Sequence, residues 1–199
     1  MIKLLVIATW NKKKAGEMEQ IISERLPGLE LRTLADYPDA PEPEETGTTY
    51  EENALIKARS ALKATGEWSL ADDAGLEIDA LPGELGVHSK RFEGEETTFH
   101  EKMRIILERM DGLPTDQRSA RFRCDVALVG PDGTEIVIED TCEGRIAEAP
   151  NGEGGFGYDP IFHLPELDCT MACLSAAQKH EVSHRGKVLS KLAAWLADN

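Results

Sequence analysis

The amino-acid sequence predicts an α/β protein in which helices flank a mixed β-sheet. Three patterns support this fold class: a β–loop–α–β pattern opens the chain, a long hairpin pattern follows later, and segments of helical period separate the strand-like runs. A chain of 199 residues has the size of one domain, or of two lobes that share a core. We therefore expect a single domain of two lobes over residues 1–199.

The chain begins with a strand, a helix and a second strand. Residues 2–9 form a continuous apolar run of strand length, which is typical of a buried strand. Apolar residues then recur at helical spacing from Ala15 to Leu26, and Pro27 and Gly28 end the helix. Residues 29–33 alternate and predict the second strand.

A loop and a second helix come next. Residues 35–49 contain three prolines and no regular period, which is typical of a loop. The sequence Thr-Tyr-Glu-Glu at residues 49–52 has the pattern of a capping box at a helix start. Helical spacing continues from there to Gly66, which ends the helix.

The segment over residues 68–80 is predicted as two short strands joined by an acidic turn. Asp72 and Asp73 directly follow the first strand, and Gly75 permits a tight bend. Two adjacent carboxylates repel each other unless a cation compensates them. Magnesium binds a few carboxylates together with waters and phosphate oxygens. The segment is therefore either a magnesium site or an exposed acidic turn.

The remaining segments repeat their apolar residues either at helical spacing or in strand-like alternation. We expect a helix over residues 99–110, a hairpin of strands 120–128 and 134–146 joined by "GPDG", a short strand at residues 161–162, a capped turn at Ser175 and Gln178, and a last helix from Ser183.

The charge of the chain limits its partners. A net charge of −15 repels duplex nucleic acid and anionic membranes, so we expect neither as a partner. A nucleotide remains possible if the chain concentrates lysine and arginine locally and recruits a divalent cation.

Cysteine spacing and the N-terminal pattern predict the compartment. The four cysteines form no CxxC pair and show no zinc-like spacing with histidine, so we expect reduced thiols in or near the core: Cys124, Cys142, Cys169 and Cys173. No apolar run approaches the ~20 residues that cross a bilayer. The basic residues mostly follow the first apolar run, which is the wrong order for a signal peptide. We therefore expect a cytoplasmic protein.

A basic segment joins the first strand to the first helix. It consists of Thr9, Trp10, Asn11, Lys12, Lys13 and Lys14. Backbone N–H groups at a helix start attract anions, whereas lysines there oppose the helix dipole, and a phosphate chain would resolve that conflict. The segment lacks the P-loop spacing. It is either a phosphate site or a solvated basic turn.

Two further segments contain candidate binding residues. Asn53 and Lys57 lie one helical turn apart after an acidic stretch without lysine or arginine, so they point into a cleft or lie on a solvated surface.

In "NGEGGFGYDPIF", residues 151–162, the glycines allow close approach of a ligand and Phe156 offers a stacking face worth about 1–3 kcal/mol per base. A structural turn is the alternative for this segment.

Six motifs in order resemble the inosine triphosphate pyrophosphatase family. They are "ATWNKKK", "EETG", "ENALIKAR", "ADDAGLEID", "GGFGYDPIF" and "SHRGK", and they extend from the first strand to the last helix. The resemblance implies a house-cleaning enzyme that uses Mg²⁺ to convert dITP, ITP or XTP to the monophosphate and pyrophosphate. It also implies an elongated mixed α/β fold of two lobes with a substrate cleft between them, and a homodimer.

The resemblance also assigns roles to residues. Residues 9–14 would hold the triphosphate, Glu45 and Asp73 would bind magnesium, and the residues needed for the reaction would be Asp73, Lys14, Lys57 and Asp72. The purine pocket would be formed by Phe156, Gly157, Tyr158, Asp159, Lys179, His184 and Arg185. The family often has serine after the aspartate pair, where this chain has Ala74, so only a backbone N–H contact remains there.

The resemblance leaves alternatives for the activity. Donors from His184 and Arg185 would favour the 6-carbonyl of hypoxanthine or xanthine over the amino group of adenine. A pyrophosphatase acting on other modified or pyrimidine nucleotides is one alternative. A nucleotide-binding protein that has lost hydrolysis is another.

Overall fold

The computed structural model describes residues 2–198. Their seven strands form one sheet in the order β2-β1-β3-β4-β5-β6-β7. The strands are β1 (Leu4–Ile7), β2 (Glu30–Thr33), β3 (Trp68–Ile78), β4 (Ser119–Val129), β5 (Glu135–Ile146), β6 (Phe162–Leu164) and β7 (Cys169–Thr170). The helices are α1 (Lys12–Arg25), α2 (Tyr50–Thr65), α3 (Phe99–Arg109), α4 (Ala176–Val182) and α5 (His184–Asp198).

The sheet is mixed, as predicted. Strand β1 pairs in parallel with both β2 and β3, whereas β6 pairs antiparallel with β5 and β7. The α/β fold class is therefore confirmed. The short strand β7 was not predicted, because two residues carry no readable period.

The chain divides into two compact units. Unit 1 contains the described residues up to Asp73, Cys124–Asp140 and the described residues from Arg185 on, and unit 2 contains Ala74–Arg123 and Thr141–His184. Strands β3, β4 and β5 each contribute residues to both units.

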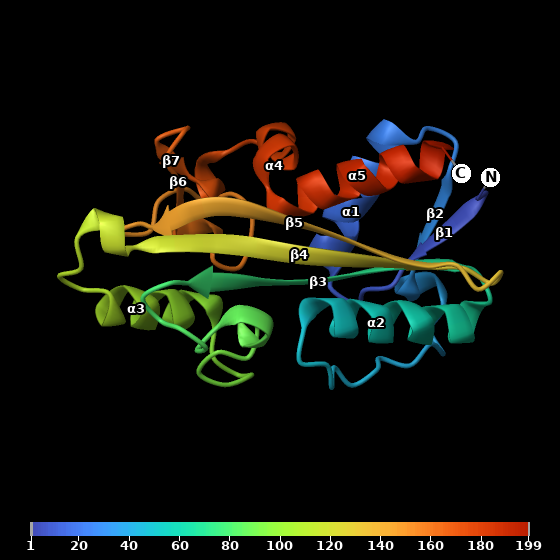
Figure 1. The fold of residues 1–199 in the computed structure, drawn as a ribbon, viewed down its shortest axis with the longest axis horizontal. Helices are drawn as coiled ribbons and strands as arrows, with labels where there is room; N and C mark the ends of the chain where they lie inside the picture. The colour runs from blue at the N-terminus through green and yellow to red at the C-terminus, as the bar shows by residue number, and fades with distance from the viewer. Residues whose placement is uncertain (1, 199) are drawn as a thin grey trace. The chain divides into compact units, whose positions relative to one another are not determined.

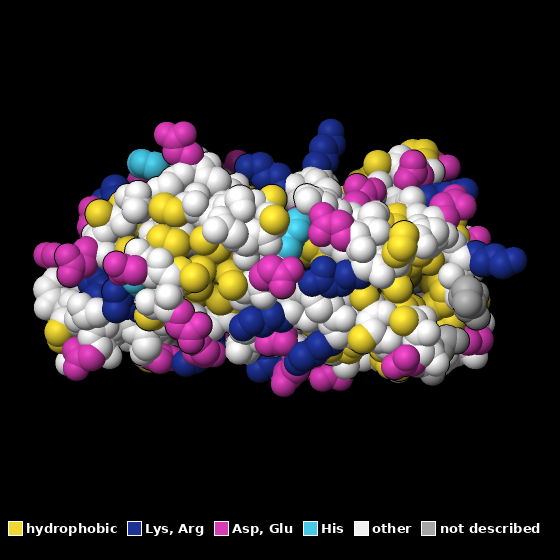
Figure 2. Space-filling model, turned by 90° about the horizontal axis from the view of Figure 1, so that it is seen from above, with side chains coloured by type: hydrophobic (Ala, Val, Ile, Leu, Met, Phe, Trp, Pro, Cys, Tyr) yellow, Lys and Arg dark blue, Asp and Glu magenta, His cyan; other side chains and the backbone are white. Residues whose placement is uncertain are grey.

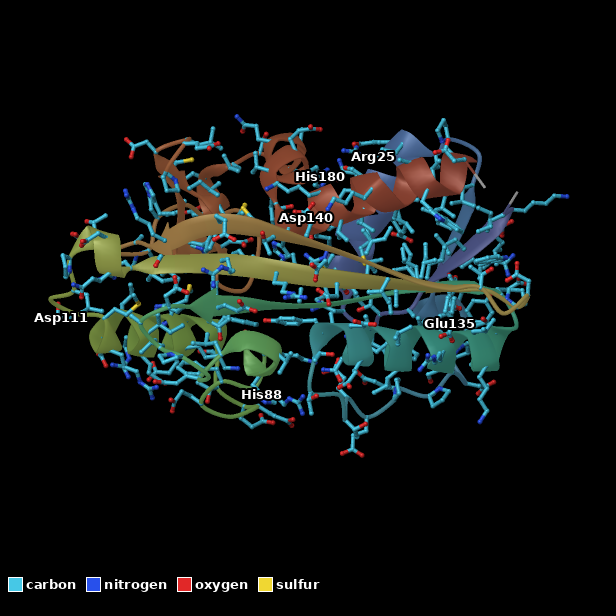
Figure 3. All side chains as sticks on the ribbon, in the orientation of Figure 1. Arg25, His88, Asp111, Glu135, Asp140 and His180 are labelled. Atoms are coloured by element: carbon cyan, nitrogen blue, oxygen red, sulfur yellow. The ribbon has the colours of Figure 1, made fainter. Side chains whose placement is uncertain are left out.

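In unit 1, helices cover both faces of the strands. Helices α1 and α5 lie on one face and α2 lies on the other (Figure 1). Small apolar side chains of α2, Ala54 and Ala58 among them, form a buried cluster with Val6 and Val129. On the other face, Arg25 of α1 donates to Ser190 of α5 over 2.9 Å; the side chain of Arg25 is labelled in Figure 3.

In unit 2, an aromatic and aliphatic core lies beside the strands. Helix α3 and helix α4 lie on opposite sides of these strands (Figure 1). Ile106 of α3 is fully buried in one cluster with Leu76, Phe122 and Phe162. The rings of Phe122 and Phe162 lie 4.4 Å apart between centroids. This core supports the glycine-rich segment, because Tyr158 belongs to it.

Helix ends follow the expected signals with one exception. Gly66 ends α2 in the left-handed region at φ 74°, and Ser175 and Gln178 form a reciprocal capping box at α4. Thr49 caps α2 by accepting the N–H of Glu52. The carboxylate of Glu52, however, accepts from the backbone and hydroxyl of Thr48 instead of returning to Thr49. The expected capping box at residues 49–52 is therefore only half formed.

The predicted acidic turn is wrong. Residues 68–78 form one continuous strand, β3, and Asp72 and Asp73 lie within it. Aspartate is rare in strands and glycine weakens them, so the local pattern indicated a break. Both aspartates are buried and paired with basic side chains from helices, and this pairing allows the strand to continue.

The surface carries charges of both signs. Figure 2 shows acidic and basic side chains intermixed on the face that it draws. All four cysteines are free thiols; Cys124 and Cys142 are buried as expected, Cys169 is half-buried, and Cys173 is exposed, so the expected location near the core is wrong for Cys173. Among residues 2–198, no helix combines the length and the apolar character needed to span a membrane.

Candidate active site

Two groups of charged residues surround the middle of β3 in unit 1. Successive side chains of a strand point to opposite faces, so Asp72 and Asp73 face different helices. Strand β1 pairs with β3 only as far as Leu70, which also accepts the N–H of Ala8. The two aspartates therefore lie just beyond the carboxyl end of β1. Open α/β sheets bind their ligands at the carboxyl ends of their strands.

The Asp72 cluster consists of Lys14, Glu17, Asp72 and Arg185. Lys14 of α1 donates to both carboxylate oxygens of Asp72, at 3.3 and 3.1 Å. Arg185 of α5 donates to Asp72 Oδ2 through Nε at 3.1 Å and Nη2 at 2.8 Å, and to Glu17 through Nη1 at 2.5 Å. Asp72 and Arg185 are almost completely buried.

The Asp73 cluster consists of Glu45, Asn53, Lys57 and Asp73. Lys57 Nζ lies 2.8 Å from Asp73 Oδ1 and 3.1 Å from Glu45 Oε1. Asn53 donates to the other oxygen of Asp73 over 3.3 Å. The structure thus places Asn53 and Lys57 inside a polar site and not on a solvated surface.

The two aspartates differ in acidity. Burial alone would raise the pKa of Asp72, but the charges of Lys14, Arg185 and Lys57 outweigh it and hold that pKa well below its ordinary value. Burial raises the pKa of Asp73, although Lys57 opposes the shift. Asp72 therefore remains ionised and paired, whereas Asp73 is the carboxylate of the two that can accept a proton.

The Asp73 cluster has donors that suit a hard divalent cation. One ammonium group bridges Glu45 and Asp73, so their oxygens already lie on either side of a positive charge. Among residues 2–198, no three His, Cys, Asp or Glu side chains gather as a complete metal cage. Magnesium requires no such cage, since it takes one or two carboxylates and completes its shell with waters and substrate phosphates. The two carboxylates fit a magnesium ion bound together with a nucleotide.

The basic segment at the start of α1 differs in detail from expectation. Asn11 caps the helix, because its Oδ1 accepts the N–H groups of Lys13 and Lys14 at 3.0 and 3.2 Å. Thr9 Oγ1 accepts the N–H of Asn11. Two helix N–H groups are therefore already satisfied, and the exposed side chains of Lys12 and Lys13 are the cations that an anion can reach.

The glycine-rich segment of unit 2 is organised by Asp159. Its Oδ2 accepts the backbone N–H of Phe156 and the ammonium group of Lys179, both at 2.9 Å. The ammonium group of Lys179 also lies 4.5 Å from the centre of the Phe156 ring. A Cβ at Gly155 would lie 2.0 Å from Asp159 Oδ2, and φ there is 70°, so only glycine fits. These contacts fix the conformation of the turn and the position of the Phe156 ring on it.

Tyr158 packs beneath this turn. Its hydroxyl donates to the carbonyl of Ser89 over 2.7 Å, and its ring contacts Phe99 edge to face at 5.1 Å. Burial raises its pKa above the ordinary value. Gly157 has φ of 68°. These contacts assign Tyr158 to support of the segment.

The last two predicted base-binding residues belong to different units. His184 is buried in unit 2, where its ring stacks on Phe122 at 4.8 Å. Arg185 belongs to unit 1, and all three of its guanidinium nitrogens donate to Asp72 or Glu17.

Sequence reasoning missed Glu17. Glu17 lies three residues after Lys14 on one face of the same helix, and this spacing is the signal that could have indicated it.

Comparison with known proteins identifies the family. The sequence model of the Ham1 family matches residues 5–195. The chain belongs to the Ham1 family.

Similar proteins agree with this membership. The chain is 47% identical over 191 residues to a Geobacillus kaustophilus protein named dITP/XTP pyrophosphatase, covering 96% of this chain and 93% of that protein. It is 44% identical over 193 residues to a protein of the same name from Vibrio cholerae, covering 96% and 95%. These names confirm the resemblance that the six motifs indicated.

Solved structures confirm the Ham1 fold. A HAM1 protein from Coxiella burnetii matches with a TM-score of 0.88 and 38% identity, covering 100% of both chains. The Staphylococcus aureus Ham1 protein matches with a TM-score of 0.86 and 39% identity, covering 98% of this chain and 99% of that one.

Proposed function

We propose that this Ham1 protein hydrolyses deaminated purine nucleoside triphosphates, namely dITP, ITP and XTP, to the nucleoside monophosphate and pyrophosphate. The observation that carries the proposal is the nearly full-length similarity to proteins named dITP/XTP pyrophosphatase. The charged residues around β3 support it, because they offer both cations and hard oxygen ligands beside the carboxyl end of β1. Such an enzyme removes damaged nucleotides from the cellular pool.

The charge balance of unit 1 supports a metal-dependent reaction. Three basic side chains face four carboxylates in the two clusters, which leaves one net negative charge. A triphosphate adds further negative charge, so these residues alone would repel it. Magnesium held by Glu45 and Asp73 would supply positive charge to the phosphate oxygens. The exposed Lys12 and Lys13 would contribute to the same balance.

The residues of the Asp73 cluster have separate tasks in pyrophosphate release. Water attacks the α-phosphorus, and the protein must orient the groups and neutralise charge. We assign the water-orienting or proton-accepting carboxylate to Asp73, since Asp72 is ionised and fully paired with Lys14 and Arg185. Lys57 would move from the carboxylates toward a phosphate oxygen when a nucleotide binds.

The glycine-rich segment of unit 2 would bind the purine. Phe156 offers its ring as a stacking surface, and the bond from its N–H to Asp159 fixes the backbone there. Lys179 and His184 would donate to the 6-carbonyl of the base. Arg185 would act on Asp72, to which its guanidinium group donates twice.

We also propose a homodimer in the cytoplasm without nucleic-acid partners. The net charge of −15 supports the last point, since it opposes binding to a polyanion. Analytical ultracentrifugation tests the dimer. A sedimentation coefficient that fits one chain at micromolar concentration would exclude it.

A substrate panel tests the proposed activity. Initial rates of pyrophosphate release are measured on ITP, XTP, dITP, GTP and ATP, with Mg²⁺ and with EDTA. We expect rapid, Mg²⁺-dependent release from the first three and slow release from GTP and ATP. Tight binding of ITP without turnover would instead support a nucleotide-binding protein, and faster turnover of a pyrimidine nucleotide would support a different pyrophosphatase.

A further inference from the structure

We propose that Asn53 is a positioning residue that holds Glu45 and Asp73 at the spacing a divalent cation needs. The proposal deepens the function proposed above, since it concerns the same cluster. It rests on the two hydrogen bonds of one buried carboxamide. Nothing in its motif "ENALIKAR" distinguished that role from a surface position.

The carboxamide of Asn53 joins two segments that are distant in sequence. Its Nδ2 donates to Asp73 Oδ2 on β3 over 3.3 Å, and its Oδ1 accepts the N–H of Gly47 over 2.9 Å. Gly47 lies two residues after Glu45 in the loop before α2. One side chain therefore holds both the strand that carries Asp73 and the loop that carries Glu45.

Burial and close packing make this link specific. Asn53 is only 1% exposed, so a lost hydrogen bond there cannot be replaced by bulk water. A Cβ at Gly47 would lie 2.6 Å from Asn53 Oδ1 and 2.7 Å from the Cβ of Glu52. The loop can approach Asn53 this closely only because residue 47 is glycine.

The neutrality of Asn53 separates its role from that of Lys57. Lys57 also joins Glu45 to Asp73, but a divalent cation at those carboxylates repels an ammonium group. The N–H group of a carboxamide carries no net charge, so its hydrogen bond to Asp73 Oδ2 is compatible with a cation that Glu45 and Asp73 would hold. Asn53 is thus the contact that remains when Lys57 leaves. Groups that orient metal ligands in this way typically change metal affinity by about 10–100-fold when they are removed.

The first test measures metal binding without catalysis. Mn²⁺ alone is titrated into the full-length protein, and binding is followed by electron paramagnetic resonance. We expect Asn53→Ala to raise the Mn²⁺ dissociation constant about 10–100-fold. Glu51→Gln, an exposed carboxylate on the first turn of the same helix, is the matched control and should leave it unchanged. An unchanged Mn²⁺ affinity in a folded Asn53→Ala protein would overturn the proposal.

The second test measures the link to the loop. Hydrogen exchange at the Gly47 amide reports the bond to Asn53 Oδ1 directly. We expect faster exchange in Asn53→Ala, and exchange close to wild type in Asn53→Asp, because aspartate keeps the acceptor. Asn53→Asp should nevertheless lower kcat about tenfold or more at saturating Mg²⁺, because its carboxylate repels Asp73. Equal Gly47 exchange in all three proteins would refute the link.

These readouts remain informative if the main variant is unstable. Asn53→Leu, which has a side chain of similar shape without either hydrogen-bonding group, replaces Asn53→Ala in both measurements where Asn53→Ala does not fold, with the same expected changes. Unfolding of both variants would assign Asn53 to stability and overturn the positioning role. A wild-type protein without Mg²⁺-dependent hydrolysis would refute the proposed function alone, because Mn²⁺ binding and Gly47 exchange do not depend on turnover.

Discussion

Lys57 Nζ lies 2.8 Å from Oδ1 of Asp73, and the same ammonium group reaches Glu45 at 3.1 Å. Burial alone would lower the pKa of Lys57, but the charges of Asp73, Asp72 and Glu45 outweigh it and raise that pKa above its ordinary value, so this lysine is charged at neutral pH. The ion cluster is therefore preformed: positive charge lies between two carboxylates before any ligand arrives. Preformed charge of this kind requires no reorganisation at the moment of reaction.

Replacing Asp73 by asparagine should abolish most of the activity. We expect Asp73→Asn to lower kcat for dITP by about 10²–10⁴-fold at saturating Mg²⁺, the range for loss of a general base. Steady-state rates of pyrophosphate release provide the measurement. Glu77→Gln, a half-exposed carboxylate on the same strand, is the control and should retain wild-type kcat. Near-normal turnover by Asp73→Asn would remove Asp73 from the chemical step.

Replacing Lys57 should leave two carboxylates facing each other. In Lys57→Met the repulsion between Glu45 and Asp73 is no longer compensated, and a cation for the phosphates is lost. We expect kcat/KM for ITP to fall about 100-fold, which corresponds to about 2.7 kcal/mol. Lys63→Met, an exposed lysine on the same helix, should change it less than twofold. If both variants behave alike, Lys57 has no part in the reaction.

Most helices and strands could be predicted from the sequence, because the apolar spacing and the end signals of each element lie within its own residues. Helix α2 is an example: its apolar stripe, its cap at Thr49 and its end at Gly66 all lie within its own sequence. The continuous strand β3 was not readable, because its stability depends on partners distant in sequence. Asp72 pairs with Lys14 and Arg185, which lie 58 and 113 residues away.

In the candidate site too, contacts between residues distant in sequence could not be predicted. Motif resemblance indicated Glu45, Lys57 and Asp73, and the structure brings these three together. Resemblance also implied that Arg185 binds the purine, which stays a prediction. The structure adds its ion pairs with Asp72 and Glu17, which no motif indicated. Which acid neutralises a buried arginine is decided by tertiary packing, and one sequence does not contain that information.

Asp72 should contribute to stability and not to proton transfer. Its folded-state pKa is depressed, so its contribution is present above the unfolded value of 3.8 and is lost as pH falls toward the folded value. Because Asp72→Asn breaks buried ion pairs, we expect it to lower the free energy of unfolding at pH 7 by about 3–5 kcal/mol.

Urea denaturation of the wild-type protein and of Asp72→Asn at several pH values tests the direction of this pH dependence. The difference between wild type and Asp72→Asn should be constant from pH 8 to pH 5. Below pH 3.8 it should shrink by up to about 1.4 kcal/mol per pH unit. A difference that grows on acidification would show that the carboxylate is not the stabilising partner of Lys14 and Arg185.

Asp159 should control affinity for the base without changing the chemical step. Its Oδ2 accepts both the N–H of Phe156 and the ammonium group of Lys179, so Asp159→Asn weakens two bonds at once. A displaced Phe156 ring loses stacking worth about 1–3 kcal/mol, equivalent to a KM for ITP that is about 5–150-fold higher. We expect kcat to stay within a few-fold, because this turn contains none of the residues that we assign to the reaction at the phosphate. Glu153→Gln, an exposed carboxylate in the same segment, should leave both parameters unchanged. A fall in kcat at constant KM would instead assign Asp159 to the reaction itself.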